Sequence, residues 1–212
     1  EVTLDQFNRF VEETGYKTDS ERDGKGVHSL VDDKWVQDPR FSWKHPAFTQ
    51  EADHPVVCVS WNDATKFCEW LSKKYGLVKS YLPTEAHWEY ACRAGSTSLW
   101  HCGDSEADLR ASVWFDVNSG GKPHSVGQLQ PNRFGLYDMH GNVEEWCADW
   151  YSESYENTPT DGSAYKISNE KGRVLRGGSW NGSAENSRCS SRINLGSGGR
   201  NYFIGFRVLI EL

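Results

Sequence analysis

Hydrophobic side chains recur with the spacing of a helix close to the start of the chain. Thr3 and Gln6 form a capping box ahead of this stretch, and Gly15 follows it, where a glycine commonly ends a helix. The apolar face consists of Phe7, Phe10 and Val11. The pattern therefore predicts a short first helix between Thr3 and Gly15.

Two further helices are predicted by the same periodicity. One begins near Asn62 and ends before Gly76. Its apolar face is made by Ala64, Phe67, Cys68, Leu71 and Tyr75. The other follows a cap at Thr84, covers residues 85–93 and ends near Gly95. We expect the longer of the two to pack against the core.

The rest of the chain shows no sustained period. Residues 16–53 interleave polar and aromatic side chains, which predicts a long irregular segment. The apolar run 56–59 predicts a buried strand, and beyond Gly95 glycine-rich turns separate short strand-like runs up to Leu212. The pattern predicts one loop-rich α+β domain over residues 1–212, with three short helices and short antiparallel strands.

Composition and charge indicate the kind of core and exclude some classes of partner. The chain has 10 Trp and 1 Met, so we expect a core built from rigid rings among loops. Its formal net charge is −7, and Lys and Arg are scattered without a basic stripe, so nucleic acid is not an expected partner. No apolar run approaches the about 20 residues that a membrane span requires.

Cysteine and histidine spacing gives no metal motif. The 6 cysteines contain no CxxC pair, and the 7 histidines contain no HExxH. This spacing does not indicate a zinc site, a thioredoxin-like redox pair or a metallohydrolase. From the residues alone we expect a mixture of buried thiols and one or two disulfides.

Six motifs occur in a recognisable order. They are EVT at 1–3, VSWNDA at 59–64, LPTEAHWEYA at 82–91, FGLYDMHGNVEEW at 134–146, RGGSW at 176–180 and GFRV at 205–208. Together they resemble the formylglycine-generating enzyme family, also called the sulfatase-modifying-factor family, over essentially the whole chain. The resemblance implies an irregular, C-type-lectin-like fold. It also implies a strand ahead of residue 1, so we expect residues 1–212 to be a fragment.

The resemblance also shows where the enzyme's chemistry is missing. Family enzymes oxidise a sulfatase cysteine to formylglycine with copper and oxygen, holding copper(I) between two thiolates. The first thiolate follows the GGS-aromatic motif by two residues, where this chain has Gly182. The only downstream cysteine, Cys189, matches a family disulfide cysteine instead, so copper is not expected. A formylglycine-generating or related oxidase that draws its metal ligands from elsewhere is the alternative.

A calcium site is implied by the same resemblance. The side chains of Asp138 and Glu145 and the carbonyls of Gly141 and Val143 correspond to a structural Ca²⁺ site of the family. Hard Ca²⁺ favours such a shell of oxygen ligands. The alternative is that Glu145 caps or forms a salt bridge and Asp138 makes a turn.

The segment after the GGSW motif resembles the variable region of target proteins of diversity-generating retroelements. In that arrangement Arg188, Arg192 and Arg200 are framework residues, and positions between them contact a ligand, which is a protein or a small molecule. These positions are Asn181, Gly182, Ser183, Asn186, Ser191, Ile193, Asn194, Leu195, Asn201, Tyr202 and Phe203. We expect Tyr202 and Phe203 to be the anchors, because aromatic side chains dominate binding hot spots. The alternative is an ordinary polar loop.

One disulfide is implied by the resemblance. Cys92 and Cys189 occupy positions that are bridged in related enzymes. If this bridge forms, an extracellular or cell-surface location is favoured, because disulfides persist in oxidising compartments.

Overall fold

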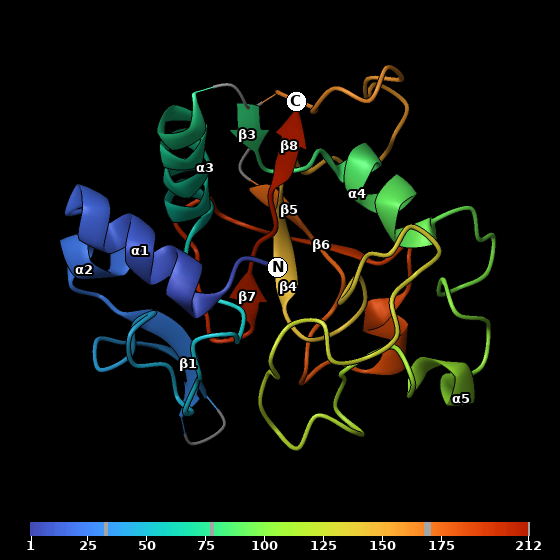
Figure 1. Cartoon of the computed structure of the whole chain (residues 1–212), viewed down its shortest axis with the longest axis horizontal. Coiled ribbons are helices and arrows are strands. Elements are labelled where there is room, and N and C mark those ends of the chain that lie inside the picture. Colours follow the sequence, from blue (N-terminus) through green and yellow to red (C-terminus); the bar gives the residue numbers. More distant parts are fainter. Residues whose placement is uncertain (32–33, 77–78, 168–170, 212) are drawn as a thin grey trace.

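The computed structural model describes residues 1–31, 34–76, 79–167 and 171–211 (Figure 1). The α-helices are α1 (Leu4–Thr14), α2 (Asp19–Asp23), α3 (Trp61–Tyr75), α4 (Glu85–Arg93) and α5 (Glu106–Leu109), with a 3₁₀ turn η1 (Ala184–Ser187). The strands are β1 (Val27–Val31), β2 (Lys34–Asp38), β3 (Lys79–Tyr81), β4 (Glu144–Trp150), β5 (Arg173–Arg176), β6 (Arg192–Leu195), β7 (Ile204–Gly205) and β8 (Leu209–Glu211). This α+β, loop-rich architecture confirms the predicted fold class.

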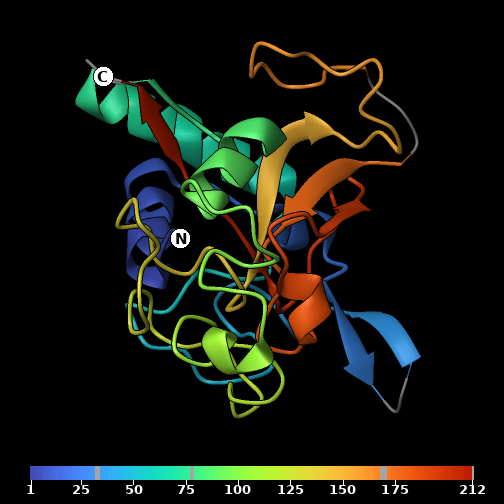
Figure 2. The same cartoon turned by 90° about the vertical axis from the view of Figure 1, so that its right-hand side faces the viewer.

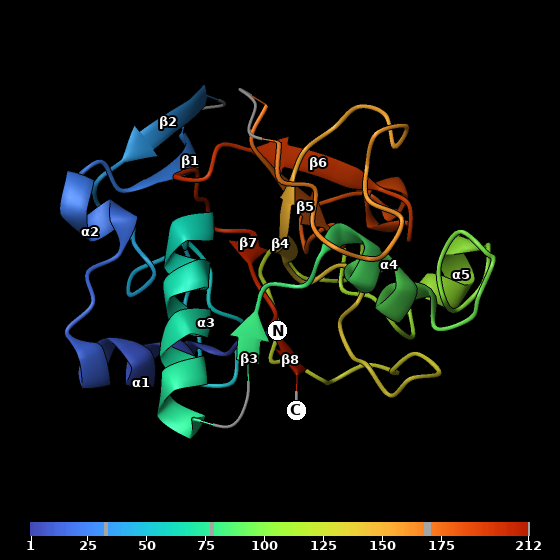
Figure 3. The same cartoon turned by 90° about the horizontal axis from the view of Figure 1, so that it is seen from above.

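A four-stranded sheet in the order β6-β5-β4-β7 lies at the centre. β5 runs antiparallel to both β4 and β6, as predicted, whereas β7 pairs with β4 in parallel. Helices α1 and α3 lie on one side of the sheet, and α4 and α5 lie on the other (Figures 1 and 3). The sheet thereby separates an aromatic core beneath α1 and α3 from a smaller core beneath α4.

The larger core is built from rings, as the composition predicts. Phe67 of α3 packs edge-on against Phe10 of α1 and against Phe206, with ring centroids 5.7 and 5.4 Å apart. Such edge-to-face pairs stabilise beyond the area they bury. The smaller core beneath α4 contains Trp88, Cys92, Met139, Cys147, Val174 and Cys189.

The three predicted helices are confirmed with their caps. The Thr3–Gln6 capping box precedes α1, and the Thr84 side chain accepts a hydrogen bond from the backbone N–H of His87 at the start of α4. Gly76 ends α3 in the left-handed conformation. The predicted apolar face of α3 is correct except at its last member, since Tyr75 is 58% exposed.

Two predictions of local structure were wrong. Residues 16–53 contain α2 and the antiparallel β1–β2 hairpin, which projects from the body of the domain (Figure 2). The run 56–59 is fully buried but is not a strand. Cys58 has φ of 64°, a left-handed conformation that interrupts the pleat of a strand. The run therefore forms single backbone hydrogen bonds, from the Val56 N–H to the Val2 carbonyl and from the Cys58 N–H to the Asn201 carbonyl.

Candidate functional site

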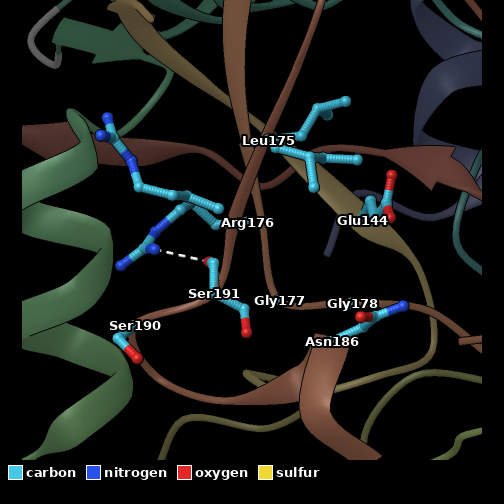
Figure 4. A pocket seen from close by; sticks show the side chains of 10 residues that line it. Glu144, Leu175, Arg176, Gly177, Gly178, Asn186, Ser190 and Ser191 are labelled. Atoms are coloured by element: carbon cyan, nitrogen blue, oxygen red, sulfur yellow. Dashed lines mark hydrogen bonds between the residues drawn. The ribbon is translucent and has the colours of Figure 1, made fainter. Parts of the chain in front are cut away.

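A pocket of about 460 Å³ opens where the central sheet meets the segment after η1. Glu144 at the start of β4 and Arg176 at the end of β5 lie on opposite sides of it (Figure 4). Asn186 of η1 and Ile193 of β6 also line it. Its volume is in the range of small-molecule sites, which combine apolar walls with a few polar groups.

Glu144 is the unusual polar group of this pocket. Its Oε2 is buried and has no hydrogen-bond partner among the described residues. Burial raises the pKa of the Glu144 carboxyl to about 8, because no neighbouring cation offsets the cost of removing its charge from water. The side chain keeps partial contact with solvent through the pocket. The pocket therefore holds a carboxyl group with one oxygen that no described residue hydrogen-bonds.

Arg176 does not neutralise Glu144, because its guanidinium is already engaged. The side chain is completely buried and pairs with Glu89 and, at 3.7 Å, with Glu85, both on α4. It also donates to the carbonyls of Ser191 and Cys189 at 2.5 and 2.8 Å. The arginine thus fixes the segment after η1 against α4 and gives the pocket a rigid wall.

The structure brings part of the predicted ligand face into this pocket. Asn186, Ser191 and Ile193 line it, and Ile193 is 47% exposed. Asn181 and Asn194 are exposed elsewhere on the surface, while Gly182, Ser183 and Leu195 are partly exposed. Asn201 is only 7% exposed and accepts a hydrogen bond from the backbone N–H of Phe203, so it is a turn-forming residue rather than part of the exposed face.

Tyr202 and Phe203 form a second feature of the C-terminal segment. Trp35 of β2 stacks on Tyr202 with ring centroids 6.3 Å apart and meets Phe203 edge-on at 5.9 Å. Both C-terminal rings are partly exposed, and Trp35 is 54% exposed. We call Trp35, Tyr202 and Phe203 the aromatic patch. It is connected to the pocket through the backbone, since the N–H of Glu144, which lines the pocket, donates to the Phe203 carbonyl at 2.9 Å.

Two of the three predicted framework arginines, Arg192 and Arg200, hold the loops in place, whereas the Nε of Arg188 is buried without a hydrogen-bond partner among the described residues. Arg192 pairs with Glu85 of α4 and donates to the Ser152 carbonyl. Arg200 forms a two-pronged ion pair with Asp23 and donates to the Gly26 carbonyl at 2.8 Å. Each of these two arginines ties the C-terminal segment to a distant part of the chain.

The predicted calcium ligands lie close together. Glu145 Oε2 accepts hydrogen bonds from Trp88 Nε1 at 2.6 Å and from Arg207 Nε at 2.5 Å, whereas Oε1 is buried without a partner. Asp138 is buried and accepts from the backbone N–H of Gly127 at 2.7 Å. No described residue donates a hydrogen bond to the Gly141 or Val143 carbonyl. Glu145 forms a salt bridge with Arg207, and Asp138 has φ of 53°, a left-handed turn conformation, as the alternative interpretation expects. The four oxygen donors are of the kind that Ca²⁺ prefers, and calcium binding stays a prediction.

The residues after the GGSW motif do not fit a two-thiolate copper site. Gly182 offers no side chain, and Cys189 lies in the core beneath α4. The Cys92 and Cys189 sulfurs are 3.7 Å apart as free thiols, so the structure brings the predicted disulfide partners together. The hydrogen bond from the Cys92 thiol lowers the pKa of Cys189 to about 5, while burial raises the pKa of Cys92.

The irregular, loop-rich α+β architecture with a short mixed sheet is of the C-type-lectin-like class. Within that class the chain belongs to the family of the sulfatase-modifying factor enzyme 1-like domain, whose model matches residues 1–212. Formylglycine-generating enzyme from Mus musculus is 33% identical over 220 residues, covering 85% of this chain and 55% of that protein. The chain thus spans about half the length of that curated relative.

Two solved structures share the fold. PvdO from Pseudomonas aeruginosa has a TM-score of 0.85 and 31% identity, and the match covers 100% of this chain and 78% of that chain. Treponema denticola variable protein 1 has a TM-score of 0.72 and 29% identity, and the match covers 98% of this chain and 81% of that chain. The second match supports the resemblance of the C-terminal segment to variable proteins. Among the described residues no helix combines the length and apolar character needed to cross a bilayer.

Proposed function

We propose that this chain is a non-catalytic binding module whose ligand contacts the Glu144 pocket and the connected aromatic patch. The observation that carries the proposal is the pocket itself, which joins a carboxyl without a partner to side chains of the C-terminal segment. Asn186, Ser191 and Ile193 line it, and buried ion pairs of Arg176 fix its wall. A rigid wall that carries exchangeable surface side chains is suited to recognition, because little ordering is required on binding.

The carboxyl of Glu144 can meet two kinds of ligand group, a hydrogen-bond acceptor or a cation. Because burial keeps the pKa of Glu144 near 8, the carboxyl is mostly protonated at neutral pH and can donate a hydrogen bond. A ligand that brings a positive charge would instead favour the ionised form, since a nearby cation offsets the cost of burial. The aromatic patch adds apolar contact area, which anchors most protein interfaces.

The competing function is an oxidase that modifies a sulfatase cysteine. It lacks support at the position of the first copper thiolate, where Gly182 stands. An oxygen-consumption assay on a cysteine-containing peptide with copper present separates the two functions. The binding module should not consume oxygen.

A displayed library of random peptides, selected on the purified chain, tests the binding function. Selected peptides should bind the parent and lose at least about tenfold in affinity for the Tyr202→Ala/Phe203→Ala variant, because two aromatic anchors are removed. The matched control is Tyr90→Ala/Phe134→Ala, which removes another exposed aromatic pair whose ring centroids are 5.5 Å apart. Equal loss in both variants, or peptides that contact neither pair nor the pocket, would contradict the proposal.

A further inference from the structure

Three potential metal ligands meet in the core beneath α4. Cys92 belongs to α4, His140 precedes β4, and Cys189 follows η1. Each of the three residues is at most 1% exposed. Cys92 Sγ lies 3.7 Å from Cys189 Sγ and 3.5 Å from His140 Nε2, and Cys189 Sγ lies 3.9 Å from the same nitrogen. No other such group of His, Cys, Asp or Glu occurs within the described ranges of the chain.

These separations match a tetrahedral zinc site. Zn–S bonds of about 2.3 Å and Zn–N bonds of about 2.1 Å at tetrahedral angles place two sulfurs about 3.8 Å apart. The same geometry places sulfur and nitrogen about 3.6 Å apart. The two distances from Cys92 agree with these values to about 0.1 Å, and the third is longer by about 0.3 Å. Small movements of the Cys189 side chain would complete the geometry.

The histidine is oriented as a metal ligand would be. His140 Nδ1 lies 2.6 Å from the Ser187 carbonyl, so Nδ1 carries the proton and Nε2 presents its lone pair. Metal-binding histidines typically donate their other N–H to a carbonyl or carboxylate in this way. Nε2 now accepts a hydrogen bond from the backbone N–H of His101 at 3.2 Å, and a metal ion would replace that contact.

We propose that Cys92, Cys189 and His140 bind a thiophilic metal ion, of which Zn²⁺ fits best. Two sulfurs and one imidazole suit zinc or copper(I), and a tetrahedral arrangement of such ligands is typical of zinc. The fourth position is left to a water molecule or a carbonyl oxygen. Because all three side chains are buried away from any substrate-sized opening, we expect the ion to have a structural rather than a catalytic role, even though three protein ligands alone do not fill its coordination shell. It joins α4, the segment before β4 and the segment after η1.

The metal site and the Cys92–Cys189 disulfide exclude each other, because both use the same two sulfurs. The metal site also uses His140 Nε2 as a ligand, which a disulfide does not. The inference is independent of the proposed ligand, since the site does not reach the surface. A metal ion at Cys189 would help to fix the wall of the pocket, because Ser190 and Ser191, which line the pocket, follow Cys189 directly. Arg176 holds the same stretch by donating to the Cys189 carbonyl at 2.8 Å.

The test is a titration of the reduced, metal-free chain with Co²⁺, followed by displacement with Zn²⁺. We expect one Co²⁺ per chain, thiolate-to-cobalt charge-transfer absorption and a tetrahedral visible spectrum, all lost on adding Zn²⁺. Loss of an outer-shell partner of a metal ligand typically weakens metal binding about 10–100-fold. Cys92→Ser and His140→Gln remove proposed direct ligands, so each should weaken Co²⁺ binding by more than that. Cys68→Ser, which removes another buried thiol, is the matched control and should bind like the parent.

The parent protein decides the question even if a ligand variant fails to fold. Absence of thiolate charge-transfer bands in the reduced parent would overturn the proposal. Retention of those bands in folded Cys92→Ser would do the same. A peptide map that finds Cys92 bridged to Cys189 in freshly isolated protein, with no metal in elemental analysis, would establish the disulfide instead. Elemental analysis of freshly isolated, reduced protein distinguishes a zinc site from a copper site.

Discussion

Glu144→Gln should remove a pH-dependent loss of stability. In the folded protein burial raises the pKa of Glu144 to about 8, compared with 4.5 for an unburied glutamate. Between these two pH values the unfolded chain loses the proton and the folded chain keeps it. The unfolded state therefore binds fewer protons, and the free energy of unfolding falls as pH rises through this window. Below pH 4.5 the contribution is fully present, and above about pH 8 it is lost.

The size of the effect follows from the interval between the two pKa values. A rise in pKa from 4.5 to about 8 corresponds to a change of about 5 kcal/mol in the free energy of unfolding, at about 1.4 kcal/mol per pH unit. Glu144 keeps partial solvent contact in the pocket, and solvent screening reduces this upper limit. We expect the parent to lose about 2 kcal/mol between pH 5 and pH 9 relative to Glu144→Gln.

The assay is urea unfolding of parent and variant at pH 5, 7 and 9. Other groups titrate equally in both proteins, so the difference between the two free energies of unfolding isolates position 144. Glu51→Gln, at an exposed glutamate, is the control and should follow the parent at every pH. A constant difference between parent and Glu144→Gln across the three pH values would show that the carboxyl ionises normally and refute the argument.

Two further predictions concern the segment 138–145. Calcium should raise the melting temperature of the parent relative to the protein in chelator. At a hundredfold excess over the dissociation constant, bound calcium adds about 2.7 kcal/mol to the free energy of unfolding. Asp138→Ala should abolish that difference, and a parent indifferent to chelator would count against a calcium site. Gly141→Ala should cost about 3 kcal/mol or more in urea unfolding, because the φ is +69° and a Cβ would lie 2.0 Å from the Trp114 carbonyl oxygen. Gly120→Ala, at φ of +65° with open space around it, should lose only about 1 kcal/mol, and equal losses would refute the steric argument.

Helices with sustained periodicity and clear caps were predictable from the sequence. The capping box of Thr3 and the left-handed Gly76 are local signals, so they do not depend on the rest of the fold. The β1–β2 hairpin was missed because it projects from the domain, and its exposed Trp35 and Val36 do not follow a one-sided apolar alternation. The run 56–59 was mistaken for a strand because burial alone does not reveal a left-handed residue at Cys58.

The candidate site was predictable only in part, because contacts across the chain define it. The composition of the C-terminal segment pointed to Asn186, Ser191 and Ile193, which line the pocket. Glu144 was missed, although a glutamate next to Glu145 at the start of a buried strand is a signal that could have found it. The metal cluster is invisible to motif spacing, since Cys92 and Cys189 are 97 residues apart and His140 is 48 residues from Cys92.

The arginines hold the fold of the C-terminal segment independently of its exposed side chains. Arg176 and Arg200 are at most 3% exposed, and their ion pairs reach Glu89 on α4 and Asp23 at the end of α2. Removing one partner of a buried pair costs about 3–5 kcal/mol, because the other charge is left without compensation. Substitutions at exposed positions such as Asn194 usually change stability by only about 0.5 kcal/mol. Stability is therefore concentrated in the arginines, and the side chains between them are free to differ in what they bind.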